Sequence, residues 1–120
     1  MGRKLLFLLA LLYTLLLIGA SLFSLKDIPV EKISTSDKVL HGVAYFVLVV
    51  VWSFVISKSK NRSFRKMLFL IGSVAFIFGI VIEILQGSLT TYREPDIWDV
   101  LANTIGIVLA MGVVTVKKKI

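Results

Sequence analysis

The side chains that could do chemistry in this chain are concentrated in one stretch, residues 83–106. This stretch lies between and within two strongly apolar segments, yet it is rich in carboxylates and amides and contains an arginine. Its candidate site residues are Glu83, Gln86, Arg93, Asp96, Asp99 and Asn103. An ionisable group inside a membrane costs roughly 2.5–3.5 kcal/mol on insertion scales, so such groups usually mark a functional site.

A second group of chemically capable side chains comprises Asp37, Lys38 and His41. Asp37 and His41 are four residues apart and would share one face of a helix. The candidates for acid–base catalysis are His41 and Glu83. Lys38 and Arg93 could instead pair with a phosphate or a carboxylate, Arg93 through two parallel hydrogen bonds.

The residue types bear on metal chemistry as well. The chain contains no cysteine, which excludes a disulfide framework and a thiolate metal site. Asp37, Asp96 and Asp99 could hold a hard divalent cation through oxygen ligands. No complete metal signature and no known nucleophile motif accompanies them, so the sequence predicts no metal site. It leaves open any cofactor and whether the chain is an enzyme.

The elements that must position these residues are apolar enough to cross a membrane. The chain has 120 residues, of which 58% are hydrophobic, and its mean hydropathy is +0.94. Soluble domains are only about 45–50% apolar. We expect membrane-spanning helices at about 5–23, 39–56, 67–85 and 96–116. The sequence therefore predicts an all-α protein, a four-helix transmembrane bundle that forms a single domain over residues 1–120.

The distribution of positive charge predicts the orientation of this bundle. Ten of the 14 Lys and Arg residues fall in the N-terminus, the 57–66 connection and the C-terminus, which share one side of a four-span protein. Because Lys and Arg are enriched on the cytoplasmic side, both termini are predicted to be cytoplasmic. The net charge of +7 is explained in this way, and we expect no nucleic-acid partner. The first apolar run could alternatively be a cleaved signal peptide, but its length favours a retained helix.

Helical spacing places the polar groups at one depth near the outer surface. Four residues form a stripe down the fourth predicted helix: Asp99, Asn103, Gly106 and Ala110. Polar groups that faced lipid would remain unsatisfied. We therefore expect Asp37 and His41 to approach the Glu83–Gln86 turn and the 96–103 face inside the bundle.

Each polar residue also has a structural explanation. Asp96 follows a proline and could cap the fourth helix, and Asp37 could cap the second. Asn103 could join two helices by a hydrogen bond. Glu83 is harder to explain, because a carboxylate near a helix C-terminus opposes the helix dipole and needs a partner. Its candidate partners are Arg93, Lys38 and His41, and we expect Arg93 to reach it from a connection, residues 86–95, that folds down as a lid.

Two separated motifs resemble the signatures of VanZ-like membrane proteins. The first is residues 37–48, DKVLHGVAYFVL. The second comprises Glu83, Gln86, Arg93, Asp96, Asp99, Asn103 and Gly106. The resemblance covers residues 37–112, with Ala110 where the family often has a second glycine. It implies a multi-pass protein of the bacterial inner membrane, whose namesake accompanies a glycopeptide-resistance gene cluster and gives teicoplanin resistance.

Three functions remain open from the sequence. The first is a cell-envelope protein whose outward-facing polar pocket binds a membrane lipid head group, a lipid-linked cell-wall precursor or a glycopeptide antibiotic. The second is a membrane-embedded acid–base or metal-dependent enzyme that acts on a lipid-linked substrate. The third is a structural or assembly protein in which the polar network only fixes the helix register. A Glu83→Gln variant separates them, since an acid–base enzyme should not tolerate it.

Overall fold

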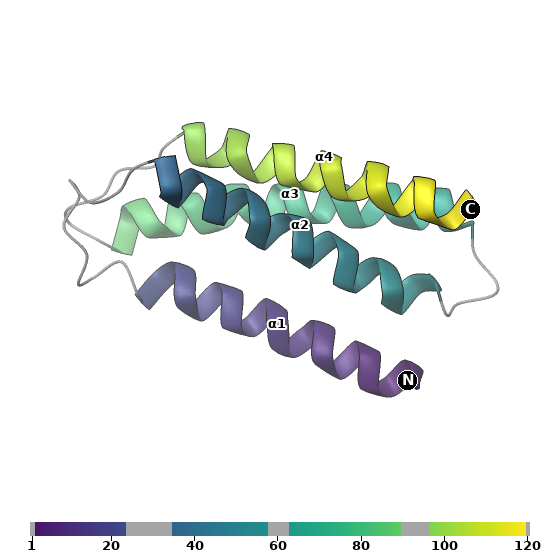
Figure 1. The fold of residues 1–120 in the computed structure, drawn as a ribbon. Helices are drawn as coiled ribbons and strands as arrows, with labels where there is room; N and C mark the ends of the chain where they lie inside the picture. The colour runs from purple at the N-terminus through teal and green to yellow at the C-terminus, as the bar shows by residue number, and fades with distance from the viewer. Residues whose placement is uncertain (1, 24–34, 58–62, 90–96, 120) are drawn as a thin grey trace.

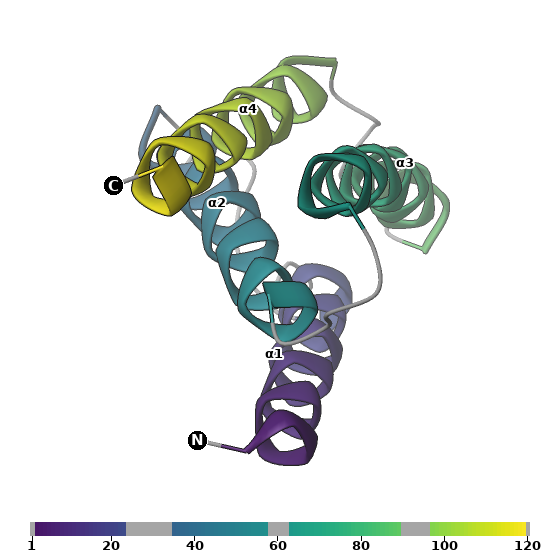
Figure 2. The same ribbon diagram turned by 90° about the vertical axis from the view of Figure 1, so that its right-hand side faces the viewer.

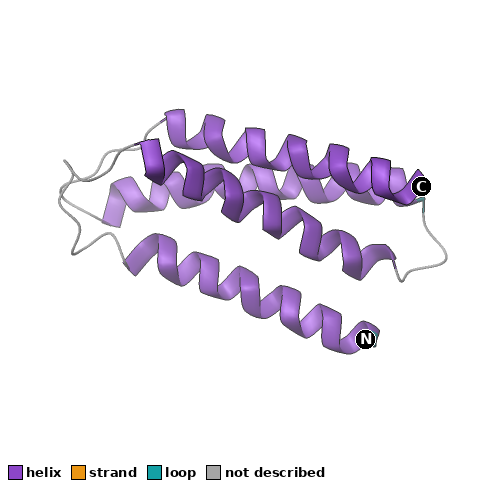
Figure 3. Cartoon of the chain, in the orientation of Figure 1, coloured by secondary structure: helices purple, strands orange, loops and turns teal. Residues whose placement is uncertain are grey.

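The computed structural model describes residues 2–23, 35–57, 63–89 and 97–119, and describes side chains at 2–20, 38–57, 63–85 and 97–117. The described residues form four α-helices and contain no strand (Figures 1 and 3). The helices are α1 (Arg3–Phe23), α2 (Thr35–Ser57), α3 (Phe64–Leu89) and α4 (Ile97–Lys119). The predicted all-α class with four membrane-length helices is therefore confirmed.

The helices extend beyond the apolar runs that predict them. α2 begins at Thr35 rather than at residue 39, and α3 runs from Phe64 to Leu89 rather than from 67 to 85. Backbone hydrogen bonds continue through polar end residues, which hydropathy alone assigns to the connections. As a result, Lys38 lies within α2, and Glu83 lies six residues before the end of α3 rather than in its last turn.

The surface of the bundle is suited to lipid. Each helix is long and apolar enough to cross a membrane, with spans of 18 to 22 residues. Large hydrophobic side chains are exposed on all four helices, for example Leu16, Leu40, Phe69 and Val108. A soluble protein rarely exposes so continuous an apolar surface, because burying it against lipid or protein is favourable. The chain has the features of a multi-pass membrane protein.

The four helices run up and down, so that α1 begins and α4 ends at the same end of the bundle (Figure 1). The opposite end contains the end of α1, the start of α2, the end of α3 and the start of α4. We call this opposite end the polar end. Viewed along the bundle, α2 lies between α1 and α4, and α3 lies beside them (Figure 2). α2 contacts each of the other three helices, and its contact with α4 is the most extensive.

Small residues allow α2 and α4 to approach closely. A Cβ atom added to Gly106 of α4 would overlap the carbonyl group of Gly42 in α2 and lie 3.1 Å from its Cα. Small residues at such crossings are typical of membrane helices, whose backbones pack in van der Waals contact. Ala110, one turn further along α4, is fully buried. The stripe predicted from Asp99 to Ala110 is therefore the buried face of α4.

α1 is attached to α2 by polar and aromatic contacts. The Tyr13 hydroxyl donates a 2.7 Å hydrogen bond to the backbone carbonyl of Ala44. The indole Nε1 of Trp52 donates to Thr14 Oγ1 at 3.0 Å, and the Trp52 ring meets Phe7 edge to face. Hydropathy gives no sign of these pairs, because each partner lies within an apolar run. In the described part of the chain, α1 contacts α2 and α3 but not α4.

Candidate functional site

A cluster of charged side chains lies at the polar end, where α2 and α4 begin and α3 approaches its end. It contains Lys38 and His41 from α2, Glu83 from α3 and Asp99 from α4, and we call it the polar cluster. One imidazole nitrogen of His41 and one carboxylate oxygen each of Glu83 and Asp99 lie within 4.8 Å of one another. Three helices that are distant in sequence therefore bring their ionisable groups to one point.

Both carboxylates of the polar cluster are buried. The relative exposure of Asp99 is 0% and that of Glu83 is 3%. Asp99 is the third residue of α4, where the positive end of the helix dipole favours a negative charge. Glu83 lies in the second half of α3 and, unlike Asp99, has no favourable helix N-terminus beside it. Burial of Glu83 must therefore be balanced by groups on the neighbouring helices, of which His41 is one.

An ion pair joins α2 and α4 within the polar cluster. Lys38 Nζ lies 2.5 Å from Asp99 Oδ1, and 28% of the Lys38 side chain is exposed. The sequence offers Lys38 as a candidate partner of Glu83, and the structure places its ammonium group against Asp99. Helix spacing predicts which residues share a face, but it does not predict which neighbouring helix that face meets. An unpaired buried charge would cost several kcal/mol.

A second layer of residues lies one helical turn deeper in the bundle. Tyr45, Gly79 and Asn103 are each four residues from His41, Glu83 and Asp99 respectively. A Cβ atom on Gly79 would lie 3.1 Å from Asn103 Nδ2 and 3.3 Å from Tyr45 Cε2. The absence of a side chain on Gly79 therefore gives Tyr45 and Asn103 room beside α3. We call these three residues the inner layer.

The inner layer contains two polar atoms without partners. Within the described residues, the Tyr45 hydroxyl and Asn103 Oδ1 are buried and make no hydrogen bond. Exposure of the two side chains is only 3% and 4%. Asn103 was predicted from the sequence, but Tyr45 and Gly79 were missed because they resemble ordinary core residues. Their spacing of four residues from His41 and Glu83 was the signal that could have found them.

The remaining predicted site residues fall outside what the structure describes. Asp37 and Gln86 lie within α2 and α3, but their side chains are not among the described ones. Arg93 and Asp96 lie outside the described residues altogether. The predicted approach of Arg93 to Glu83, and the lid formed by its connection, therefore stay predictions.

Among the described residues, one surface hollow reaches the polar cluster. It runs between α2 and α4 and is almost entirely apolar. Its lining residues are Lys38, Val39, Gly42, Val43, Phe46, Ala102, Ile105, Gly106 and Leu109. We call it the α2–α4 groove. Lys38 is the charged residue in this lining, and it lies at the polar end of the groove.

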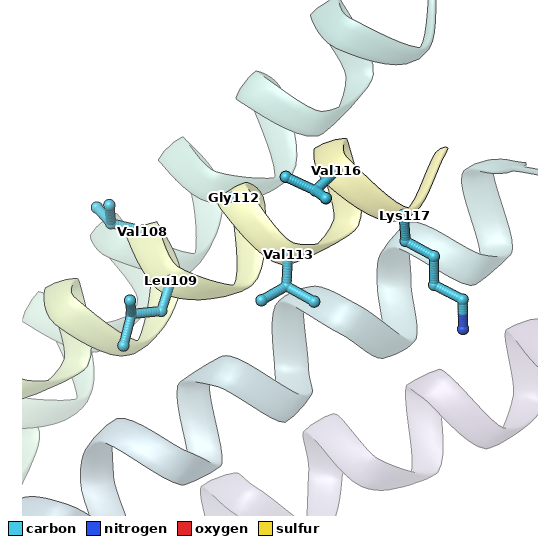
Figure 4. Close-up of a pocket in the computed structure, with 6 residues that line it drawn as sticks. All are labelled: Val108, Leu109, Gly112, Val113, Val116 and Lys117. Carbon is cyan, nitrogen blue, oxygen red and sulfur yellow. The ribbon is translucent and has the colours of Figure 1, made fainter. Parts of the chain in front are cut away.

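Two further hollows among the described residues lie away from the polar cluster. One is a shallow groove along the second half of α4, where valine and leucine side chains are arranged around Gly112 (Figure 4). The other is enclosed by α1, α2 and α3 and is lined by Thr14 and Trp52 among apolar residues. Neither contains a residue of the polar cluster or the inner layer. Acyl chains of surrounding lipid would suffice to fill both.

Four membrane-length helices with a buried charged cluster at one end define a small multi-pass membrane protein. The chain belongs to the VanZ/LLP1 family, which matches it over residues 5–118. The resemblance seen in the two sequence motifs is therefore confirmed, and the match includes α1.

A relative in a fungus shares much of this chain. Uncharacterized protein C11E3.10 of Schizosaccharomyces pombe is 32% identical to it over 103 residues. The alignment covers 86% of this chain and 59% of the relative, so the chain spans about three-fifths of the relative's length. No solved structure matches the chain. The shared sequence pattern therefore also occurs in a fungus.

Proposed function

We propose that this protein binds the head group of a membrane lipid or of a lipid-linked cell-wall precursor at the polar end of the bundle. The observation that carries the proposal is the Lys38–Asp99 ion pair at the mouth of the α2–α4 groove. A cation beside an apolar groove matches a ligand with an anionic head group and an acyl chain. Lys38 is partly exposed, so a head group at the membrane surface can reach its ammonium group.

The proposed setting is the bacterial inner membrane, with both termini in the cytoplasm. In this orientation the polar end faces outward, where lipid-linked precursors and glycopeptide antibiotics meet. The link of the VanZ-like family to glycopeptide resistance supports this setting. A protein that binds a precursor or an anionic lipid at this surface would reduce the access of a teicoplanin-type antibiotic to its target.

A membrane-embedded enzyme is the second candidate function. The observation that favours it is the proximity of His41 to two buried carboxylates, an arrangement that can hold and transfer a proton. The third candidate, a structural or assembly role, requires only that the polar cluster fix the register of the helices. Glu83→Gln separates these two candidates. It should lower turnover if the protein is an enzyme, and it should lower protein abundance if the role is structural.

Lipid retention by matched lysine variants tests the proposed binding. The full chain is reconstituted in vesicles of phosphatidylglycerol and phosphatidylcholine, extracted, and analysed for lipid that remains bound. Lys38→Met should lose the retained anionic lipid. Lys117→Met should keep it, because this substitution removes a positive charge at the opposite end of the bundle from the polar cluster. Equal retention by the two variants would contradict a head-group site at Lys38.

A susceptibility assay addresses the proposed biological role separately. The chain and its two lysine variants are expressed in a teicoplanin-sensitive bacterium at matched membrane levels. The wild type and Lys117→Met should raise the inhibitory teicoplanin concentration, and Lys38→Met should not. If none of the three changes susceptibility while lipid retention depends on Lys38, the binding site stands and the resistance role fails.

A further inference from the structure

We propose that His41, Glu83 and Asp99 form a binding site for a divalent transition-metal ion such as Zn²⁺ or Mn²⁺. Their ligand atoms already lie within 4.8 Å of one another. Ligand atoms on one tetrahedral metal ion, with bonds of about 2.1 Å, lie about 3.4 Å apart. We infer that side-chain rotations bring the three atoms onto one ion.

The donor set selects the type of ion. An imidazole nitrogen suits Zn²⁺ and the other transition metals better than it suits Ca²⁺ or Mg²⁺, and carboxylates also suit Mn²⁺. Two carboxylates balance the charge of a divalent ion, which matters because Glu83 and Asp99 are almost fully buried. Three protein ligands leave coordination positions for water or for a ligand oxygen, as in metal sites that act on substrates.

The inner layer gives an independent indication of a polar guest. Tyr45 and Asn103 lie one turn below His41 and Asp99, and their hydroxyl and Oδ1 atoms are buried without a hydrogen-bond partner among the described residues. Leaving such groups unsatisfied in an apolar interior costs free energy. Asn103 Oδ1 could complete the oxygen ligands, and the Tyr45 hydroxyl could hydrogen-bond to water on the ion. Outer partners of this kind orient metal ligands and raise affinity.

Lys38 acts as a built-in competitor for this site. Its ammonium group lies 2.5 Å from Asp99 Oδ1, so it shares the carboxylate that the ion would use. A metal ion must displace this contact or take the second oxygen of Asp99 beside a positive charge. Removing the ammonium group should therefore strengthen metal binding. A purely structural ion-pair network would show no gain in metal binding when Lys38 is lost.

The chain offers an unusually clean test, because His41 is its single histidine and it has no cysteine. The full chain, purified with a histidine-free tag in lipid nanodiscs, is stripped with a chelator and titrated with Mn²⁺ or Zn²⁺. Bound Mn²⁺ should be stoichiometric, should be displaced by Zn²⁺, and should show coupling to an imidazole ¹⁴N in pulsed electron paramagnetic resonance. Within the chain, this coupling can come only from His41.

Variants assign the ligands and the competitor. His41→Gln should abolish the nitrogen coupling, Glu83→Gln should abolish binding, and Asn103→Ala should weaken it by about 10- to 100-fold, as expected for loss of a supporting partner. Lys38→Met should bind more tightly than the wild type and than Lys117→Met. The matched control near the site is Thr104→Val, since the Thr104 hydroxyl bonds only to its own helix at the carbonyl of Val100.

Either of two results would overturn the proposed metal site. It fails if neither ion binds stoichiometrically to the wild type or to Lys38→Met, or if Glu83→Gln binds as tightly as Thr104→Val. Circular dichroism and gel filtration accompany each variant. If Glu83→Gln does not fold, the wild type and Lys38→Met still decide the outcome. The inference is independent of lipid binding, because Lys38→Met should weaken lipid retention while it strengthens metal binding.

Discussion

Asp99 shows how a fully buried charged residue can be tolerated near one end of an apolar bundle. Its side chain is fully buried, yet it lies in the first turn of α4 and pairs with Lys38 of α2. The positive end of the helix dipole and the ammonium group of Lys38 both attract its carboxylate. Glu83 lacks the first of these advantages, since it lies toward the end of α3. The polar cluster therefore contains one carboxylate placed favourably by its own helix and one that depends on its neighbours.

A double-mutant cycle should reveal the coupling between Lys38 and Asp99. Asp99→Ala should lower thermal stability, because it leaves a partly buried ammonium group without its carboxylate, a change that costs about 3–5 kcal/mol in buried pairs. Lys38→Met should also destabilise, since it leaves Asp99 buried with less compensation. The double variant should lose less than the two single losses combined. The measurement is the unfolding midpoint in one detergent, and strict additivity would show that the two residues do not interact.

At the residue scale, the sequence predicts the members of the site better than their partners. The spacing of polar residues on three predicted helices was enough to expect His41, Glu83 and Asp99 together. It was not enough to pair Lys38 with Asp99, because pairing depends on the rotation of each helix and on which helices are neighbours. Tyr45 was missed for another reason, since a tyrosine within an apolar run is usually a core residue.

At the scale of elements, the α2–α4 contact positions the polar cluster. Lys38 and His41 come from α2, Asp99 comes from α4, and the two helices touch at Gly42 and Gly106. The crossing lies between the polar cluster and the middle of the bundle, so it fixes the separation of these side chains. None of the described side chains of α1 belongs to the polar cluster, and α1 is joined to α2 through Tyr13, Thr14 and Trp52. The arrangement separates a site-forming unit of three helices from a helix that covers one side of it.

Two glycines of α4 should respond in opposite ways to the same substitution. Gly106→Ala places a Cβ against the Gly42 carbonyl, so α2 and α4 must separate, and overpacking of this kind costs about 1–3 kcal/mol. Gly112→Ala meets no atom within 4 Å and removes a poor helix former, which should stabilise by up to about 1 kcal/mol.

Thermal unfolding of the two variants in one detergent provides the comparison, with each serving as the control for the other. Gly106→Ala should unfold at a lower temperature than the wild type and Gly112→Ala at the same or a higher one. A stabilising effect of Gly106→Ala would show that the two helices do not cross at this glycine. Because the crossing lies close to Lys38 and Asp99, Gly106→Ala should also disturb any ligand binding at the polar cluster, and Gly112→Ala should not.

At the scale of the whole molecule, the fold was the most predictable feature. Four apolar runs of membrane-spanning length are visible in the sequence, and they correspond to the four helices. Hydropathy reports the lipid-facing length of a helix, so it underestimates α2 and α3, whose ends contain polar residues. It says nothing about order in space, and the central position of α2 could not be inferred from it. The side of the membrane on which each end of the bundle lies is inferred from the distribution of charge, so the orientation stays a prediction.

The predicted orientation can be tested without disturbing the fold, because the chain has no cysteine of its own. A single cysteine is introduced in place of Ser59, between α2 and α3, or in place of Thr91, between α3 and α4. Ten of the 14 basic residues fall on the side of the termini and of residue 59, which the positive-inside rule assigns to the cytoplasm.

A membrane-impermeant maleimide added to intact spheroplasts should therefore label Thr91→Cys and should label Ser59→Cys only after the membrane is permeabilised. The opposite pattern would place the polar cluster at the cytoplasmic surface. A lipid or precursor exposed on the outer face could then no longer be its ligand, whereas the metal site, which depends only on the distances among His41, Glu83 and Asp99, would be unaffected.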